Sequence, residues 1–117
     1  MKNQVNTCTI SASNPRIIAS FLEKNCLEIQ EHPADFALFE ELNAMPIEDV
    51  VTLFDKLKTW SVERTMLTIK RDKGPYAIAY MNEEHLKVHK GTQSFLFSLV
   101  KNENDKYSSI TIYISDL

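Results

Sequence analysis

The stretch QSFLFSLVKNENDKYSSITIYIS, residues 93–115, decides the fold class of this chain. Large apolar residues recur at every second position in both halves, at Phe95, Phe97 and Leu99 and then at Ile110, Ile112 and Ile114. This alternation is typical of strands with one buried face, whereas the first half alone also fits a helix capped by Thr92. Because the second half favours strands and the polar segment 102–106 resembles a loop, we predict a C-terminal β-hairpin.

A second hairpin is predicted immediately upstream, over residues 65–81. Two β-prone runs, 65–70 and 76–81, flank the segment Arg71-Asp72-Lys73-Gly74-Pro75. Glycine and proline are typical of a tight reversal. The segment 86–89 fits either a short strand or one helical turn.

A helix is predicted to begin at Pro46, because proline is favoured at the first helical position. Glu48 and Asp49 then fall in its first turn, where negative charge suits the helix dipole. Its apolar positions follow three- and four-residue spacings, at Ile47, Val50, Val51, Phe54, Leu57 and Trp60.

The N-terminal part predicts a strand over 4–12 and then a helix over 15–24. Asn14 occupies the N-cap position of this helix and Pro15 its first position. The segment 27–44 is ambiguous, because Phe36, Leu38 and Phe39 fit a short strand or, with Leu42, a helical face. We expect it to be a connector with little regular structure.

Together these elements predict one α+β domain over residues 1–117. An antiparallel sheet of four to six strands would carry two helices on one face, around one hydrophobic core. The strand 4–12 should join the later strands, because an isolated strand would expose unpaired backbone groups.

The opening residues MKNQVNTCTISAS lack the features of a secretion signal, and no apolar run approaches the roughly 20 residues that span a bilayer. We therefore expect a cytoplasmic protein without a membrane partner. Cys8 and Cys26 are too few for a disulfide framework and are expected to be thiols.

The residue patterns of enzymes are missing from the sequence, so we predict no catalytic residue, metal or cofactor. Two glycines cannot form a phosphate-binding loop. His85 and His89, beside Glu84, would have metal-binding spacing on a helix, but they fit a solvated basic segment more simply. Cys26 has no evident base beside it, so core packing is its expected role.

Charge is strongly segregated along the chain. Residues 1–22, 23–55, 56–101 and 102–117 carry net charges of +2, −8, +5 and −2, which sum to −3. The stretch 23–55 holds nine carboxylates against one base, Lys24. Such a stretch is either ordinary solvated surface or a docking surface for a basic partner.

Our leading hypothesis is a non-enzymatic inhibitor or immunity-type protein, for interbacterial toxin immunity or for phage or plasmid anti-defence. Spaced carboxylates would imitate a phosphate backbone and occlude a basic partner that processes nucleic acid, such as a nuclease toxin or a defence protein. Aromatic residues among them, Trp60 included if exposed, would anchor the complex. The candidate partner-binding residues are Glu28, Glu31, Asp35, Phe36, Phe39, Glu40, Glu41, Glu48, Asp49 and Asp55. The sequence indicates no oligomeric state.

The alternative hypothesis is a small nucleic-acid-binding module that uses the basic hairpin 65–81. Its bases would contact phosphates and its tyrosines would stack on bases. The candidates are Lys70, Arg71, Lys73, Tyr76 and Tyr80. The net negative charge and the lack of a known nucleic-acid-binding motif count against this hypothesis.

The segment NQVNTCTIS, residues 3–11, followed by the helix over 15–24, resembles the opening of the Api92-like, YubB-type ferredoxin-fold proteins of phages and plasmids. The likeness covers about a fifth of the chain, and the family's tryptophan and glycine pattern is not found around Trp60. The resemblance implies a ferredoxin-like core and a mobile-element protein, with no catalytic residues to transfer.

Overall fold

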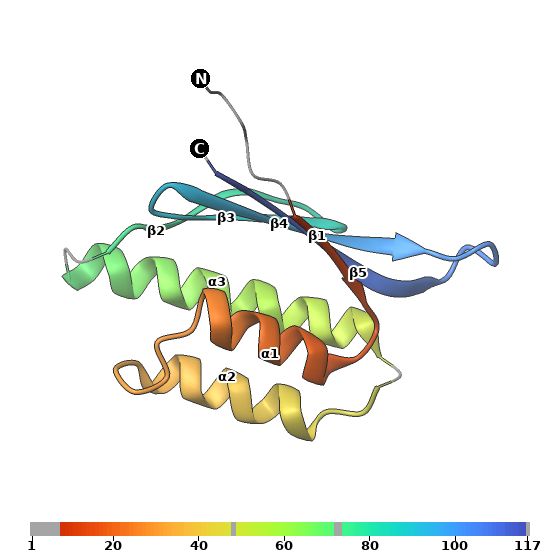
Figure 1. Ribbon diagram of the computed structural model, residues 1–117, viewed down its shortest axis with the longest axis horizontal. Coiled ribbons are helices and arrows are strands. Elements are labelled where there is room, and N and C mark those ends of the chain that lie inside the picture. Colours follow the sequence, from red (N-terminus) through yellow and green to blue (C-terminus); the bar gives the residue numbers. More distant parts are fainter. Residues whose placement is uncertain (1–7, 48, 72–73, 117) are drawn as a thin grey trace.

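All helices lie on one side of an antiparallel sheet, and one of them packs on the far side of the other two (Figure 1). The computed structural model describes residues 8–47, 49–71 and 74–116. Within these residues the elements are, in order, β1 (Cys8–Ala12), α1 (Pro15–Asn25), α2 (Pro33–Ala44), α3 (Val50–Arg71), β2 (Tyr76–Met81), β3 (His85–Lys90), β4 (Gln93–Lys101) and β5 (Tyr107–Asp116). The α+β prediction is confirmed, with three helices instead of two, and the layers are consistent with a ferredoxin-like arrangement.

The strand order of the sheet is β1-β5-β4-β3-β2, and every neighbouring pair is antiparallel. Strands β2 to β5 are joined by successive hairpins, and β1 adds to the free edge of β5, where Ile10 lies opposite Ile112. The prediction that the first strand joins the later ones is therefore confirmed for Cys8–Ala12. Residues 4–7 of that predicted strand lie outside the described residues.

Helix α1 confirms the predicted N-terminal helix, because Asn14 caps it by accepting a hydrogen bond from the Arg16 amide at 2.9 Å. The predicted start of the next helix at Pro46 is wrong. Asp49 accepts the Thr52 amide at 2.9 Å and is followed by Val50, the first residue of α3. An aspartate cap is a stronger start signal here than the proline three residues earlier.

The predicted connector over 27–44 is wrong in its second half, which forms α2. Pro33 is the first residue of this helix. Leu42 is fully buried and Leu38 nearly so, and the two lie one turn apart on the inner face of the helix. Burial of these two leucines between α1 and α3 stabilises a helix whose local signals are weak.

The predicted hairpin 65–81 is also wrong. Residues 65–70 belong to α3, whose buried face continues from Trp60 through Ser61 to Arg64. Strand β2 instead pairs with β3, so the ambiguous segment 86–89 is a strand. Packing of α3 over a long stretch outweighs the β propensity of these residues.

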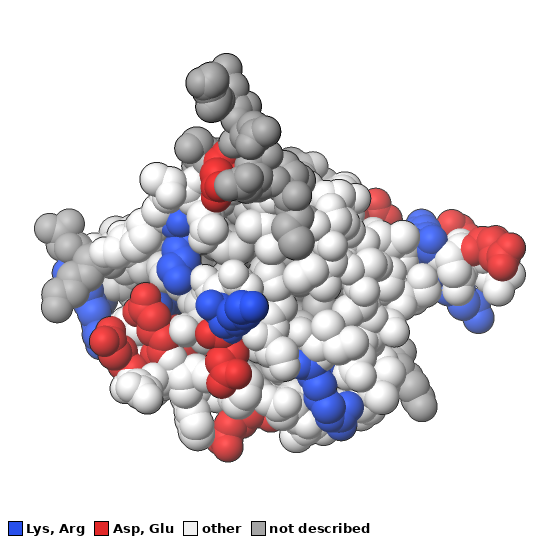
Figure 2. Space-filling model, in the orientation of Figure 1, with Lys and Arg blue, Asp and Glu red and all other residues white. Residues whose placement is uncertain are grey.

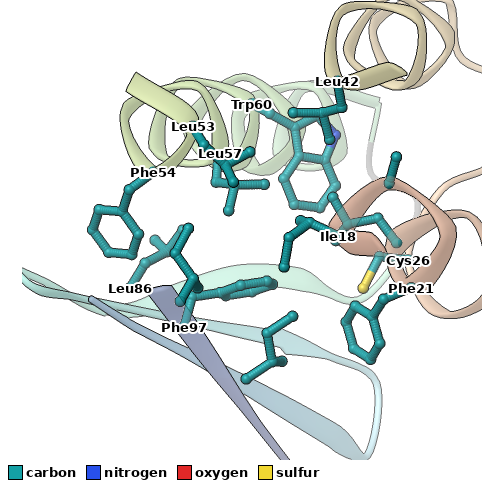
Figure 3. Packing of buried hydrophobic residues seen from close by; sticks show 14 of the residues in the cluster. Ile18, Phe21, Cys26, Leu42, Leu53, Phe54, Leu57, Trp60, Leu86 and Phe97 are labelled. Carbon is teal, nitrogen blue, oxygen red and sulfur yellow. The ribbon is translucent and has the colours of Figure 1, made fainter. Parts of the chain in front are cut away.

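The core lies between the sheet and the helices, and Figure 3 shows Phe54, Leu57 and Trp60 of α3 turned toward Leu86 and Phe97 of the sheet. Of the predicted apolar stripe, Val50, Phe54, Leu57 and Trp60 are buried. Ile47 and Val51 are exposed, and Leu53 is buried in their place.

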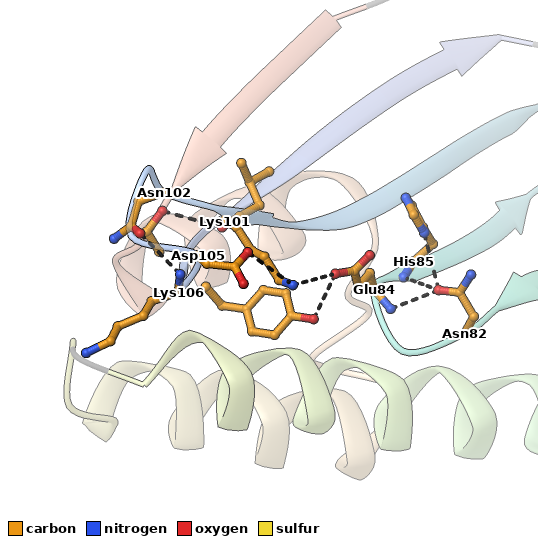
Figure 4. Close-up of polar contacts among 10 residues, drawn as sticks. Asn82, Glu84, His85, Lys101, Asn102, Asp105 and Lys106 are labelled. Carbon is orange, nitrogen blue, oxygen red and sulfur yellow. Dashed lines mark hydrogen bonds and ion pairs between the residues drawn. The ribbon is translucent and has the colours of Figure 1, made fainter.

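A polar network fixes the end of the sheet where the β4–β5 hairpin meets the β2–β3 turn (Figure 4). Glu84 accepts a hydrogen bond from the Tyr107 hydroxyl at 2.8 Å and lies 4.0 Å from Lys101 Nζ. The bond to Glu84 raises the pKa of Tyr107. Across the described ranges, no helix is long and apolar enough to cross a bilayer.

Candidate protein-docking surface

The ten candidate partner-binding residues separate into exposed, buried and undescribed groups. The exposed carboxylates are Glu31, Glu40, Glu41, Asp49 and Asp55. Glu48 lies outside the described residues. The remaining acidic candidates, Glu28 and Asp35, take part in an internal ion-pair cluster, so the predicted acidic stretch is only partly a surface.

Asp35 is the clearest correction, because its side chain is completely buried. Its Oδ1 accepts a hydrogen bond from Trp60 Nε1 at 2.8 Å, and its Oδ2 accepts the Glu28 amide at 2.8 Å and lies 3.4 Å from Arg64 Nη1. A buried carboxylate needs such partners to remain charged. Asp35 therefore connects α2 to α3 and is not available to a partner.

Glu28 is half-buried beside this pair. Its Oε2 lies 2.9 Å from Arg64 Nη2 and 3.1 Å from His32 Nε2. The Arg64 guanidinium is itself buried and stacks over the Tyr76 ring, 4.4 Å from its centroid. Glu28 and Asp35 thus neutralise a buried arginine, which is a structural task.

Two of the exposed candidate carboxylates, Glu41 and Asp55, line a groove between α2 and α3 with a volume of about 480 Å³. Ala34 and Ala37 of α2 face Thr52 and Thr59 of α3 across it, and the buried Trp60 contributes to its floor. Small side chains at these positions leave the space open. The charged residues that line the groove are Glu41, Asp55, Lys56 and Glu63.

The groove has three carboxylates and one amine, so its net charge is negative. Lys56 Nζ lies 3.6 Å from Glu41 Oε2, and both side chains are solvated. Exposed ion pairs of this kind contribute little to stability and exchange partners easily. An arginine or lysine from another molecule can therefore contact Asp55 and Glu63, and can compete with Lys56 for Glu41.

Of the aromatic candidates, Phe36 is the one that can serve as an anchor, because 46% of it is exposed. Phe39 is half-buried and packs against the core, and Trp60 is buried. Asp49 is exposed but caps α3, and hydrogen bonds from the Thr52 hydroxyl and amide lower its pKa. The usable docking residues are therefore fewer than the sequence predicts.

The side of the sheet away from the helices forms an open sheet face. Directly opposite residues in adjacent strands share a face, so Thr9, Tyr113, Leu96, Lys87 and Tyr80 form one row across it. The neighbouring rows are Ser11, Thr111, Ser98 and His85, and Ser115, Ser94, His89 and Ala77. None of the described residues in these rows is a carboxylate.

Apart from Asp116 at the end of β5, the described acidic residues lie on the helices or in loops, and none of them lies in these rows of the open sheet face. On the side seen in Figure 2, charged side chains gather over the helical layer and at the tip of the β4–β5 hairpin, with a largely uncharged surface between them. Acidic and basic residues intermingle there, so the acidic character belongs to the groove more than to a whole face.

The nucleic-acid candidates are dispersed, because the hairpin that would have united them does not form. Lys70 and Arg71 are exposed at the end of α3, and Lys73 lies outside the described residues. Tyr76 is buried, and its hydroxyl donates a hydrogen bond to the Cys26 carbonyl. Tyr80 is exposed on β2, in the row of the open sheet face.

Cys26 is a buried thiol, and burial raises its pKa from 9.0 to about 12. It is therefore protonated at neutral pH and is a poor nucleophile. Burial likewise raises the pKa of Tyr76. His85 and His89 lie on a strand, where their helical metal-binding spacing does not apply.

Donor atoms of Glu28, Glu31 and His32 lie within 4.8 Å of one another on a single turn of chain. The Arg64 guanidinium already binds Glu28 there and would repel a metal ion. We therefore assign no metal to this cluster.

The groove itself was missed in the sequence because it needs α2. A sequence signal for α2 was present, because Pro33 is followed by apolar residues at helical spacing, as Pro15 is in α1. Comparison of the chain with protein-family models, curated proteins and solved structures finds no match.

Proposed function

We propose that this chain is a non-enzymatic, cytoplasmic inhibitor or immunity-type protein that binds a basic macromolecule through its helical layer. The observation that carries the proposal is the α2–α3 groove, where Glu41, Asp55 and Glu63 oppose one lysine. A basic loop or helix of a partner would insert its arginines or lysines between the two helices. The nucleic-acid-binding surface of that partner would then be occluded without any catalytic step.

Electrostatic complementarity of this kind acts mainly on the association rate and on specificity. Phe36 is exposed on α2 but does not line the groove, so it would supply an apolar anchor only to a partner that also reaches around α2. The open sheet face has no carboxylate in its described rows, so the basic surface of a partner is attracted more strongly to the helical side. This difference would orient the partner as it approaches.

The resemblance of the N-terminal segment to phage and plasmid proteins supports a role in toxin immunity or anti-defence. In both settings, a small acidic protein that masks a nuclease would be sufficient for function. A nuclease toxin or a nucleic-acid-processing defence protein is therefore the partner that we propose.

The test is affinity capture from the lysate of the native cell at low and high salt, with protein identification and a nuclease-treated control. We expect a stoichiometric partner with a basic surface, whose binding weakens as salt screens the charges. The double reversal Glu41→Lys with Asp55→Lys should slow association with this partner roughly tenfold or more.

A matched control reverses two exposed acids elsewhere, Glu83→Lys with Glu103→Lys, and changes the net charge equally. This control should bind nearly as the natural chain does. If both double variants lose binding equally, net charge alone matters; if neither loses binding, the groove charges do not matter. Either result would mean that the groove is not the docking site.

A second candidate function, single-stranded nucleic acid binding, is favoured by the row that contains Tyr113, Lys87 and Tyr80. Two exposed tyrosines on an acid-free sheet face are suited to base stacking. The readout is a mobility shift with single-stranded RNA that is lost in Tyr80→Ala with Tyr113→Ala and kept in the groove variant. A chain that leaves the RNA unshifted even at low salt would exclude this candidate.

A further inference from the structure

The outer side of α3 carries apolar residues that nothing in the described structure covers. Met66 is 65% exposed and Ile69 is 72% exposed, and Val62 lies on the same side one turn earlier. Solvent-facing positions of a surface helix are normally polar. A contiguous exposed apolar stripe therefore indicates an interaction surface, whereas single exposed apolar residues are normal.

This stripe, Val62, Met66 and Ile69, is bordered by two opposite charges. Glu63 and Lys70 are both exposed and line a hollow of about 640 Å³ together with Met66, Leu67 and Ile69. Within the described residues, neither charge has an ion-pair partner. Glu63 and Lys70 are seven residues apart, as are Val62 and Ile69, so each pair lies two turns apart on one side of the helix.

These spacings are self-complementary. Consider a second α3 that packs antiparallel to the first, with a two-fold axis at Met66. Residues before Met66 in one copy then lie opposite residues after Met66 in the other copy. Glu63 then faces Lys70 of the second copy, and Ile69 faces its Val62. Both ion pairs fall along one border of the contact and both apolar pairs along the other.

We propose that the exposed stripe of α3 is the interface of a homodimer, in which two α3 helices pack antiparallel about Met66. A uniformly basic partner fits this stripe poorly, because Lys70 and the adjacent Arg71 would repel it. The proposal does not rest on the groove, although Glu63 lines both surfaces; Ile69→Glu and Lys70→Glu leave every groove-lining residue unchanged and therefore test the stripe alone.

The first experiment is sedimentation velocity of the full chain over a concentration series. We expect a reversible monomer–dimer equilibrium that Ile69→Glu weakens at least roughly tenfold, because two charges would be buried in each dimer. The matched control is Ile17→Glu on α1, where an equally apolar and half-exposed isoleucine lies outside the stripe. It should leave the dimer unchanged, and circular dichroism should show both variants folded.

The second experiment is a charge-swap cycle. Glu63→Lys alone and Lys70→Glu alone each place like charges opposite one another twice per dimer, and should weaken association roughly tenfold. The double variant Glu63→Lys with Lys70→Glu restores opposite pairs and should recover the natural affinity. A chain that stays monomeric at its highest soluble concentration, or a double variant as weak as the single ones, would overturn the antiparallel arrangement.

Discussion

At the scale of single residues, the ion pair between Asp35 and Arg64 has the largest structural consequence. Both side chains are buried, and Trp60 Nε1 and the Glu28 amide use the remaining acceptor capacity of the carboxylate. Such a pair need not be more stable than an apolar pair of the same shape, but losing one partner leaves an uncompensated charge.

We therefore expect Asp35→Leu to lower the free energy of unfolding by about 3–5 kcal/mol, because Arg64 loses its buried counter-ion. The double variant Asp35→Leu with Arg64→Met should regain a large part of that loss. Urea unfolding followed by the fluorescence of Trp60, the only tryptophan of the chain, gives both values. A loss in the double variant equal to the sum of the losses in Asp35→Leu and in Arg64→Met alone would show that the two residues are not coupled.

Cys26 leads to a prediction for alkaline solution. Its pKa rises from 9.0 to about 12 on burial, so above pH 9 the unfolded chain binds fewer protons than the native one. Stability is then complete below pH 9 and falls by about 1.4 kcal/mol per pH unit as the pH rises toward 12.

The variant Cys26→Ala should show a shallower loss over the same range in urea titrations at stepped pH. Some loss should persist in it, because burial of Tyr76 acts in the same direction. An unchanged slope would mean that the Cys26 thiol is not the group responsible.

At the scale of elements, the sequence predicts well where a local signal and burial agree. Asn14 and Pro15 mark the start of α1, and the alternation from Phe95 to Ile114 marks β4 and β5. Prediction from the sequence fails where packing between elements determines whether a segment forms a helix or a strand. Residues 65–70 look like a strand but extend α3 by one to two turns beyond its buried positions, which end at Arg64, and α2 folds because Leu38 and Leu42 are covered by its neighbours.

If buried leucines stabilise α2, Leu42→Ala should lower the free energy of unfolding. Leu42 is fully buried, so truncation should cost about 2–5 kcal/mol of unfolding free energy. Asn43→Ala is the control, because Asn43 is exposed on the same helix. Both can be measured by urea denaturation, and a Leu42→Ala variant as stable as the control would mean that α2 is not held by its apolar face.

At the scale of the whole molecule, the sequence reveals that charge is segregated but not where the segregated charge lies. Eight of the ten candidate docking residues are carboxylates, yet two of these point inward to Arg64 and one caps a helix. The sequence cannot distinguish these positions, because the partners of Asp35, at Trp60 and Arg64, are more than twenty residues away. The groove depends on the relative placement of α2 and α3, which no local pattern contains.

The strand order has a consequence for how the protein folds during synthesis. Strands β2 to β5 close through short turns, whereas β1 must pair across almost the entire chain, with Cys8 opposite Ile114. Contacts so distant in sequence form slowly, because the intervening loop must first be ordered. The backbone edge of β1 therefore stays without its partner until β5 has left the ribosome, and until then it is open to pairing with another chain.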